Sequence, residues 1–133
     1  MIIEQLDHLV LTVRDIKTSC DFYQQLLGMD VAEFEGGRKA LVFGSQKINL
    51  HLYGNEIAPH AAHPTPGAAD LCFLTSMPIA QFLARCSEYA IDILAGPVQR
   101  SGASGPILSV YLRDPDGNLL EIANTLSSLA EKR

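Results

Sequence analysis

The sequence predicts an α+β fold in which two βαβββ modules form a cupped, eight-stranded mixed sheet with the helices on its outer face. Two observations predict it: a strand-helix-strand-strand-strand order occurs twice, and glycine-rich turns separate the segments. The modules are expected over about residues 5–53 and 68–124, so they fill the chain. A chain of 133 residues can bury its own core, and we expect one domain.

The first module begins with an alternation of apolar and polar residues over 6–13, which is typical of a strand. Asp15 is a suitable cap for the following helix, whose apolar residues recur at helical spacing until Gly28 ends it. Turn residues then separate three short apolar segments, which are predicted to be strands over residues 29–34, 38–43 and 47–53.

The second module repeats this order. A strand is predicted over 69–75, and Ser76 is expected to cap a helix with Pro78 in its first turn. Three strands follow, and the sequence DPDG is typical of the turn between the last two. These strands are predicted over residues 91–98, 108–113 and 119–123.

A glycine- and serine-rich segment, residues 96–107, joins two of these strands and carries Arg100. It is interpreted either as a mobile lid that brings a cation to an anionic substrate or as an ordinary long hairpin loop. The lid is the preferred interpretation. No Lys-Ser/Thr pair follows the glycines, which excludes a phosphate-binding P-loop.

The composition is that of an ordinary globular protein, with 47% hydrophobic and 19% charged residues. A net charge of −5 without a cluster of Lys or Arg argues against nucleic acid or a membrane as partner. The first residues contain neither a basic leader nor a long apolar run, so a cytoplasmic protein is expected. The 3 cysteines have no CxxC spacing, which suits a reducing compartment.

Each predicted helix covers one face of its own sheet, which leaves the opposite faces free to surround a small molecule. The alternation of each strand identifies the side chains on these open faces. Five polar residues on the open faces or in the glycine-rich segment are expected to hydrogen-bond a substrate: Asn49, Tyr53, Arg100, Tyr111 and Arg113.

His8, His51 and Glu121 also belong to the open faces, and Glu121 lies between apolar neighbours. Two imidazoles and a carboxylate with open positions form an established site for a divalent transition metal. A cation would also remove the cost of a buried carboxylate, although pairing with Arg113 or Arg38 is an alternative. Asp70 is either a fourth ligand or a turn residue.

Five stretches, LDHLVLTVRDI, CDFYQQLLGM, RKALVFG, INLHLYG and RDPDGNLLEI, make the chain resemble the vicinal oxygen chelate superfamily. This superfamily includes glyoxalase I, bleomycin-resistance proteins and extradiol dioxygenases. The sequence is most similar to the glyoxalase-domain group that contains bacterial virulence-associated homologues. His8 matches the first-strand histidine of the family and Glu121 its last-strand glutamate. Two positions depart from the pattern: the fourth-strand glutamate falls near Asn49 or His51, and Asp70 replaces the fifth-strand histidine.

The resemblance implies a metal-dependent lyase, isomerase or transferase of the glyoxalase type, which chelates neighbouring oxygens of a small metabolite or xenobiotic. Glu121 would be its catalytic base, and the metal, Zn, Ni, Mn or Fe, is left open. The alternatives are a metal-free ligand-sequestering protein of the bleomycin-resistance type and an extradiol-type dioxygenase. The resemblance also implies a homodimer, whose site lies within one chain or is shared between subunits.

Overall fold

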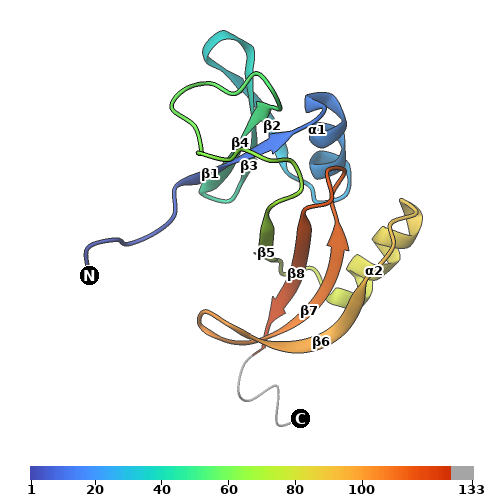
Figure 1. Ribbon diagram of the computed structural model, residues 1–133. Helices are drawn as coiled ribbons and strands as arrows, with labels where there is room; N and C mark the ends of the chain where they lie inside the picture. Colours follow the sequence, from blue (N-terminus) through green and yellow to red (C-terminus); the bar gives the residue numbers. More distant parts are fainter. Residues whose placement is uncertain (127–133) are drawn as a thin grey trace. The chain divides into compact units, whose positions relative to one another are not determined.

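A computed structural model describes residues 1–126 and divides the chain into two compact units. Unit 1 comprises Met1–Ala69 with the turn Pro115–Gly117, and unit 2 comprises Asp70–Asp114 with residues 118–126. Each unit holds one four-stranded mixed sheet and one α-helix (Figure 1). The predicted α+β class and the repeated βαβββ order are confirmed.

Unit 1 has the sheet order β1-β4-β3-β2, in which β1 and β4 are parallel and the other pairs antiparallel. The Asp15 carboxylate accepts a hydrogen bond of 2.8 Å from the backbone N–H of Thr18 and so caps α1, as predicted. The elements are β1 (His8–Val13), α1 (Ile16–Gln25), β2 (Asp30–Phe34), a 3₁₀ turn η1 (Glu35–Gly37), β3 (Arg38–Phe43) and β4 (Gln46–Leu52).

The core of unit 1 lies between α1 and one face of its sheet. Tyr23 of α1 and Val13, Leu41 and Ile48 of the strands are completely buried. Along β4 the apolar residues Ile48 and Leu50 alternate with three polar ones, which therefore lie on the opposite face of the sheet: Lys47, Asn49 and His51.

Unit 2 repeats the arrangement with the sheet order β5-β8-β7-β6. The strands β5 and β8 are parallel, and the other neighbours are antiparallel. Phe82 and Cys86 of α2 are buried, as are Val110 and Leu120 of the sheet. The elements are β5 (Asp70–Leu74), α2 (Ile79–Glu88), β6 (Ala95–Gly102), β7 (Gly105–Arg113) and β8 (Leu119–Thr125).

The N-terminus of α2 differs from the prediction. The cap position is Pro78, whose side chain makes no capping hydrogen bond, so the assignment of Ser76 is wrong. The side chain of Asn124, on β8, instead accepts a hydrogen bond of 3.0 Å from the backbone N–H of Ile79. The cap therefore comes from a residue far along the chain, which local sequence does not reveal.

The glycine-rich segment 96–107 is not a loop. Most of it lies in the paired strands β6 and β7, in which Gln99 faces Leu108 and Gly102 faces Gly105. A Cβ atom on Gly102 would lie 2.8 Å from the carbonyl oxygen of Gly105, so this glycine permits close packing of the hairpin. The predicted loop, and with it the mobile lid, is therefore corrected to an extended β-hairpin.

The turn between β7 and β8 forms where it was predicted. The carboxylate of Asp114 accepts hydrogen bonds from the backbone N–H of Asn118 at 2.9 Å and from its side-chain amide at 2.8 Å. Both side chains are buried, with exposed fractions of 6% and 1%. The turn is thus fixed by buried hydrogen bonds as well as by its Pro and Gly residues.

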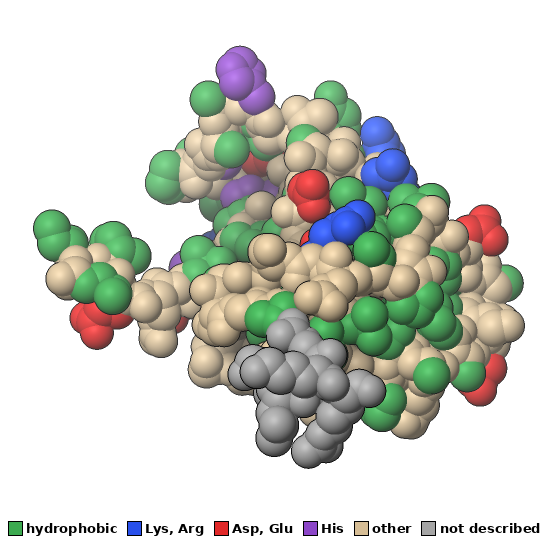
Figure 2. Space-filling model, turned by 90° about the horizontal axis from the view of Figure 1, so that it is seen from below, with side chains coloured by type: hydrophobic (Ala, Val, Ile, Leu, Met, Phe, Trp, Pro, Cys, Tyr) green, Lys and Arg blue, Asp and Glu red, His purple; other side chains and the backbone are tan. Residues whose placement is uncertain are grey.

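The charged side chains are spread over the surface in small groups. Figure 2 shows Lys and Arg in small separate groups on the face in view, with acidic side chains beside one of these groups and elsewhere toward the edge of the view. In the part of the chain that the structure describes, neither helix has the length and apolar character that crossing a bilayer requires.

Candidate functional site

The open face of the unit 1 sheet carries its polar side chains on β3 and β4. Asn49 lies opposite Ala40, and Lys47 lies opposite Val42. Since side chains alternate along a strand, Arg38 of β3 and His51 of β4 point to this same face. Continuing the antiparallel register brings Arg38 opposite His51.

Arg38, Asn49 and His51 form what we term the β3–β4 polar cluster. Within residues 1–126, the buried atoms Nε of Arg38, Oδ1 of Asn49 and Nε2 of His51 have no hydrogen-bond partner. Asn49 is only 6% exposed and His51 only 4%. Buried polar atoms in proteins are nearly always paired with protein groups or ordered water, so three unpaired ones on one face indicate a place that water or a bound molecule fills.

Neighbouring side chains hold the Arg38 guanidinium in place. It lies 4.8 Å from the centre of the Phe34 ring, and its Nη1 is 3.8 Å from the Glu35 carboxylate. The Lys47 ammonium lies 4.4 Å from the centre of the same ring. Two cations therefore share one aromatic side chain beside the cluster, which makes this face electropositive.

The protonation of His51 follows from its surroundings. Burial lowers the pKa of His51, and the positive charges of Arg38 and His60 lower this pKa further, whereas Glu56 opposes them. The ordinary value is 6.5, so the imidazole is neutral at pH 7. A neutral ring offers one N–H donor and one acceptor nitrogen to a ligand.

His8, the first predicted metal ligand, lies on the same open face as His51 but not beside it. The parallel register places His8 opposite Lys47 and His51 opposite Thr12. An offset of four residues corresponds to about 13 Å along the strands, which is too far for the two side chains to bind one cation in a compact geometry. Alternation identifies the face of a residue but not its position along the sheet.

His8 has a carboxylate neighbour. Its side chain is 43% exposed, and Nδ1 lies 2.8 Å from the Asp7 carboxylate. A histidine that donates its Nδ1 proton to a carboxylate has its Nε2 free and oriented for a metal ion, an arrangement common in metalloproteins.

The open face of the unit 2 sheet carries Glu121. The carboxylate accepts a hydrogen bond of 2.5 Å from the hydroxyl of Ser109, which is completely buried. Tyr111 on β7 and Cys72 on β5 lie opposite Glu121 on either side. Burial raises the pKa of the Cys72 thiol, as do the charges of Glu121 and Asp70, so this cysteine is not an activated nucleophile.

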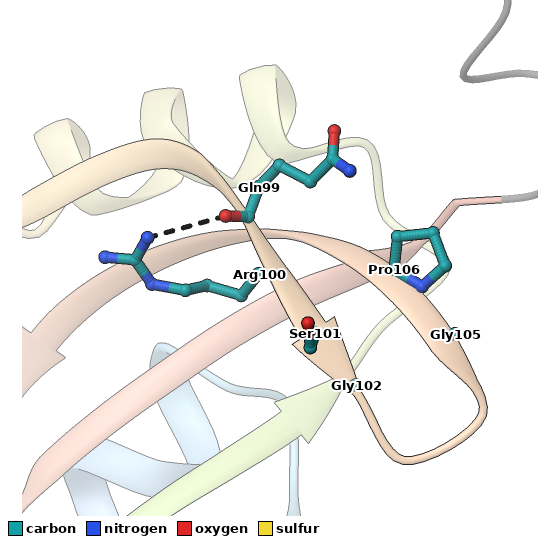
Figure 3. A pocket seen from close by; sticks show the side chains of 6 residues that line it. All are labelled: Gln99, Arg100, Ser101, Gly102, Gly105 and Pro106. Atoms are coloured by element: carbon teal, nitrogen blue, oxygen red, sulfur yellow. Dashed lines mark hydrogen bonds between the residues drawn. The ribbon is translucent and has the colours of Figure 1, made fainter.

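Arg100 and Tyr111, two predicted substrate residues, contact each other. Arg100 Nε donates a hydrogen bond of 3.1 Å to the Tyr111 hydroxyl, and its guanidinium lies 5.7 Å from the centre of the ring. At the end of the same hairpin a shallow depression of about 630 Å³ is lined by residues 99–102, 105 and 106 (Figure 3). In this depression, Arg100 Nη1 donates a hydrogen bond of 3.4 Å to the backbone oxygen of Gln99 (Figure 3).

The remaining predicted residues lie at strand ends. Asp70 begins β5 opposite Leu119, which on its other side faces Arg113 at the end of β7. Tyr53 follows β4 and is 57% exposed. Within either unit, the described residues contain no group of three His, Cys, Asp or Glu side chains arranged to hold a metal ion.

Two residues of the candidate site lie outside the predicted set. Arg38 was considered only as an ion-pair partner for Glu121, and Ser109 was given no role. The alternation of β3 provides a signal for Arg38, because it places Arg38 on the same face as Ala40 and Asn49. The Ser109 contact depends on the register of β7 with β8, for which the sequence contains no local signal.

The family model of the Glyoxalase/Bleomycin resistance protein/Dioxygenase superfamily matches residues 5–122. The virulence protein STM3117 of Salmonella typhimurium is 54% identical over 92% of this chain and 85% of its own length. Its crystal structure superposes with a TM-score of 0.92, covering 95% of this chain and 100% of that one. The glyoxalase domain-containing protein RDO1 of Mycosarcoma maydis is 52% identical over 92% of this chain and 69% of its own length.

Two more distant structures share the fold. A lactoylglutathione lyase from Agrobacterium tumefaciens has a TM-score of 0.71 at 20% identity and covers 93% of this chain and 96% of its own. The antibiotic-binding protein TnmS3 from Streptomyces has a TM-score of 0.74 at 20% identity and covers 95% and 99%. At this identity the likeness concerns the fold alone, which carries unrelated functions.

Proposed function

Since the chain belongs to the Glyoxalase/Bleomycin resistance protein/Dioxygenase superfamily, we propose that it is a metal-dependent enzyme of the glyoxalase type. Its reaction would be that of a lyase, isomerase or transferase on a small, oxygen-rich metabolite or xenobiotic. The observation that carries the proposal is the carboxylate of Glu121, held by Ser109 on an otherwise largely apolar strand.

The chemistry of the donor groups fits a divalent transition metal at His8 and Glu121. The contact between His8 and Asp7 is the kind that orients a metal-binding imidazole, and a carboxylate is the second common ligand. His51 is removed from the proposed ligand set because of its offset from His8, and Asp70 is retained as a further ligand. When bound, the cation supplies Lewis-acid stabilisation of negative charge on substrate oxygens.

The chain's own residues have separate tasks in this proposal. Glu121 binds the metal or takes a proton from the substrate, and the Ser109 hydroxyl fixes its orientation. The β3–β4 polar cluster binds the substrate. Tyr111 and Arg100 both hydrogen-bond to the substrate. Tyr53 and Arg113, at strand ends, make further contacts with it.

Metal analysis of the purified protein tests the proposal. We expect the wild-type chain, reloaded with Zn²⁺, Ni²⁺, Mn²⁺ or Fe²⁺, to retain one ion, and His8→Ala and Glu121→Gln to bind it at least about tenfold more weakly. His63→Ala and Glu33→Gln are matched controls, because these residues lie on an exposed segment and in an exposed ion pair with Lys39. Equal binding by all variants would contradict the proposal.

A metal-free ligand-binding protein is the second candidate function. The β3–β4 polar cluster favours it, because hydrogen bonding to these three residues requires no cation. In that case the purified protein would retain none of the four metals under any loading condition, and small molecules would bind to it without metal. An extradiol-type dioxygenase would instead require Fe²⁺ and consume oxygen with a catechol.

We also propose a cytoplasmic homodimer. Mixing the His8→Ala and Glu121→Gln variants tests whether subunits share a site: recovery of metal binding in the mixture requires that one site draws its ligands from two chains. If each variant stays as weak as it is alone, each chain forms its own site.

A further inference from the structure

The β3–β4 polar cluster specifies the chemistry of the molecule that completes it. Leaving a buried polar group unpaired is costly, so a ligand that pairs all three groups gains free energy from each of them. The groups also differ in kind: one is a donor, one is an acceptor, and one can be either.

Arg38 sets the charge of the guest. Its Nε–H is a donor that remains buried and unpaired within the described residues, and the side chain is only 25% exposed. Phe34 and Glu35 hold the guanidinium, so little side-chain freedom is lost when a ligand binds. Lys47 adds a second positive charge at the same ring. An oxygen of an acid group is the best partner for such a donor.

Asn49 sets a second requirement. Its Oδ1 accepts hydrogen bonds and, in the described part of the chain, receives none. An acid group that is fully ionised has no proton to offer it, so the guest must carry a separate donor. Asn49 and Arg38 lie on adjacent strands two residues apart in register, which is a span that a small molecule can bridge. The neutral His51 ring, beside both, accepts either kind of group.

We propose that the β3–β4 polar cluster binds a small hydroxycarboxylate, with its carboxylate on Arg38 and its hydroxyl on Asn49 and His51. This inference rests on the proposed function in that the guest is the substrate, or its product, of the same protein. The site itself contains no proposed metal ligand. Binding therefore survives removal of metal, which allows the two proposals to fail separately.

Titration of the chelator-treated protein with three simple anions tests the inference. Glycolate carries a carboxylate and a hydroxyl, acetate lacks the hydroxyl, and inorganic phosphate replaces the carboxylate by another acid. Backbone amide shifts of β3 and β4 in NMR spectra report where each anion binds. We expect glycolate to bind at these strands about tenfold more tightly than acetate or phosphate.

Three variants sharpen the test. Arg38→Gln is expected to weaken glycolate binding about tenfold or more, and Asn49→Leu to reduce glycolate to the affinity of acetate. Lys39→Gln is the matched control, because Lys39 neighbours Arg38 on β3 but pairs with Glu33 at 2.7 Å. It should bind glycolate as the wild type does, and thermal melts show which variants remain folded.

Several results would overturn the inference. The inference fails if phosphate binds more tightly than glycolate or if acetate binds as tightly as glycolate. It also fails if Arg38→Gln binds glycolate as the wild type does, or if no anion shifts the amide signals of β3 and β4. The last result would mean that only water fills the site. A protein that binds metal through His8 and Glu121 but shows one of these results would retain the proposed function and lose this inference alone.

Discussion

The open faces of the two sheets are built from the same βαβββ order but treat their polar groups differently. In unit 2, Ser109 donates to Glu121 and Arg100 donates to Tyr111. In unit 1, the β3–β4 polar cluster keeps three buried atoms without partners among residues 1–126. One face therefore satisfies these polar groups by itself, whereas the other leaves buried hydrogen-bonding atoms available to a ligand. The same repeated order can thus carry polar groups that are paired within the sheet in one unit and left unpaired, among the described residues, in the other.

The largest expected effect is at the buried pair of Asp114 and Asn118 in unit 2. Asp114→Ala should lower the free energy of unfolding by about 3 kcal/mol, because it removes two hydrogen bonds to the buried Asn118. Urea denaturation measures the change. Asp92→Ala, at an exposed position, should change it by less than about 0.5 kcal/mol. A loss of similar size in both variants would contradict the prediction that the hydrogen bonds between Asp114 and Asn118 stabilise the fold.

A smaller loss is expected on the open face of unit 2. Ser109→Ala removes a hydrogen bond to a carboxylate and should lower the free energy of unfolding by about 2 kcal/mol. Ser101→Ala, on the exposed part of β6, is the control and should be neutral. If Ser109→Ala were as stable as the wild type, the description of this face as internally satisfied would be wrong.

The smallest effect has the opposite sign and concerns the open face of unit 1. Asn49→Leu replaces a buried polar group by an apolar one of similar size and should raise the free energy of unfolding by about 1 kcal/mol. The same variant should bind glycolate poorly. This combination of higher stability and lower affinity is expected if Asn49 serves binding at the cost of stability. A loss of stability comparable with that of Ser109→Ala would show that Asn49 has structural partners.

Much of the fold was predictable because its signals are local. The alternation of residues 6–13, the Asp15 cap and the DPDG turn each depend on a few neighbouring residues, and all three features are present. The extension of β6 and β7 through residues 99–107 was missed because the glycines and serines there are also typical of a flexible loop. In the structure Gly102 is required by the close approach of the facing strand.

The candidate site was predicted less completely. Alternation correctly placed Asn49 and His51 on the open face of their sheet, together with His8. It omitted Arg38, because β3 was left out of the comparison of faces. It also suggested that His8 and His51 approach each other, although their strands are paired with an offset of four residues.

The sequence by itself determined the α+β class, the repeated order of elements and the face to which each strand residue points. These follow from periodicity and turn chemistry, which act over a few residues. Only the tertiary structure decided which residues meet across strands, and hence that Glu121 is paired with Ser109 while Arg38, Asn49 and His51 share one face of their sheet on paired strands. Strand register depends on contacts between distant segments, and it therefore decides which polar groups are satisfied and which are left for a ligand.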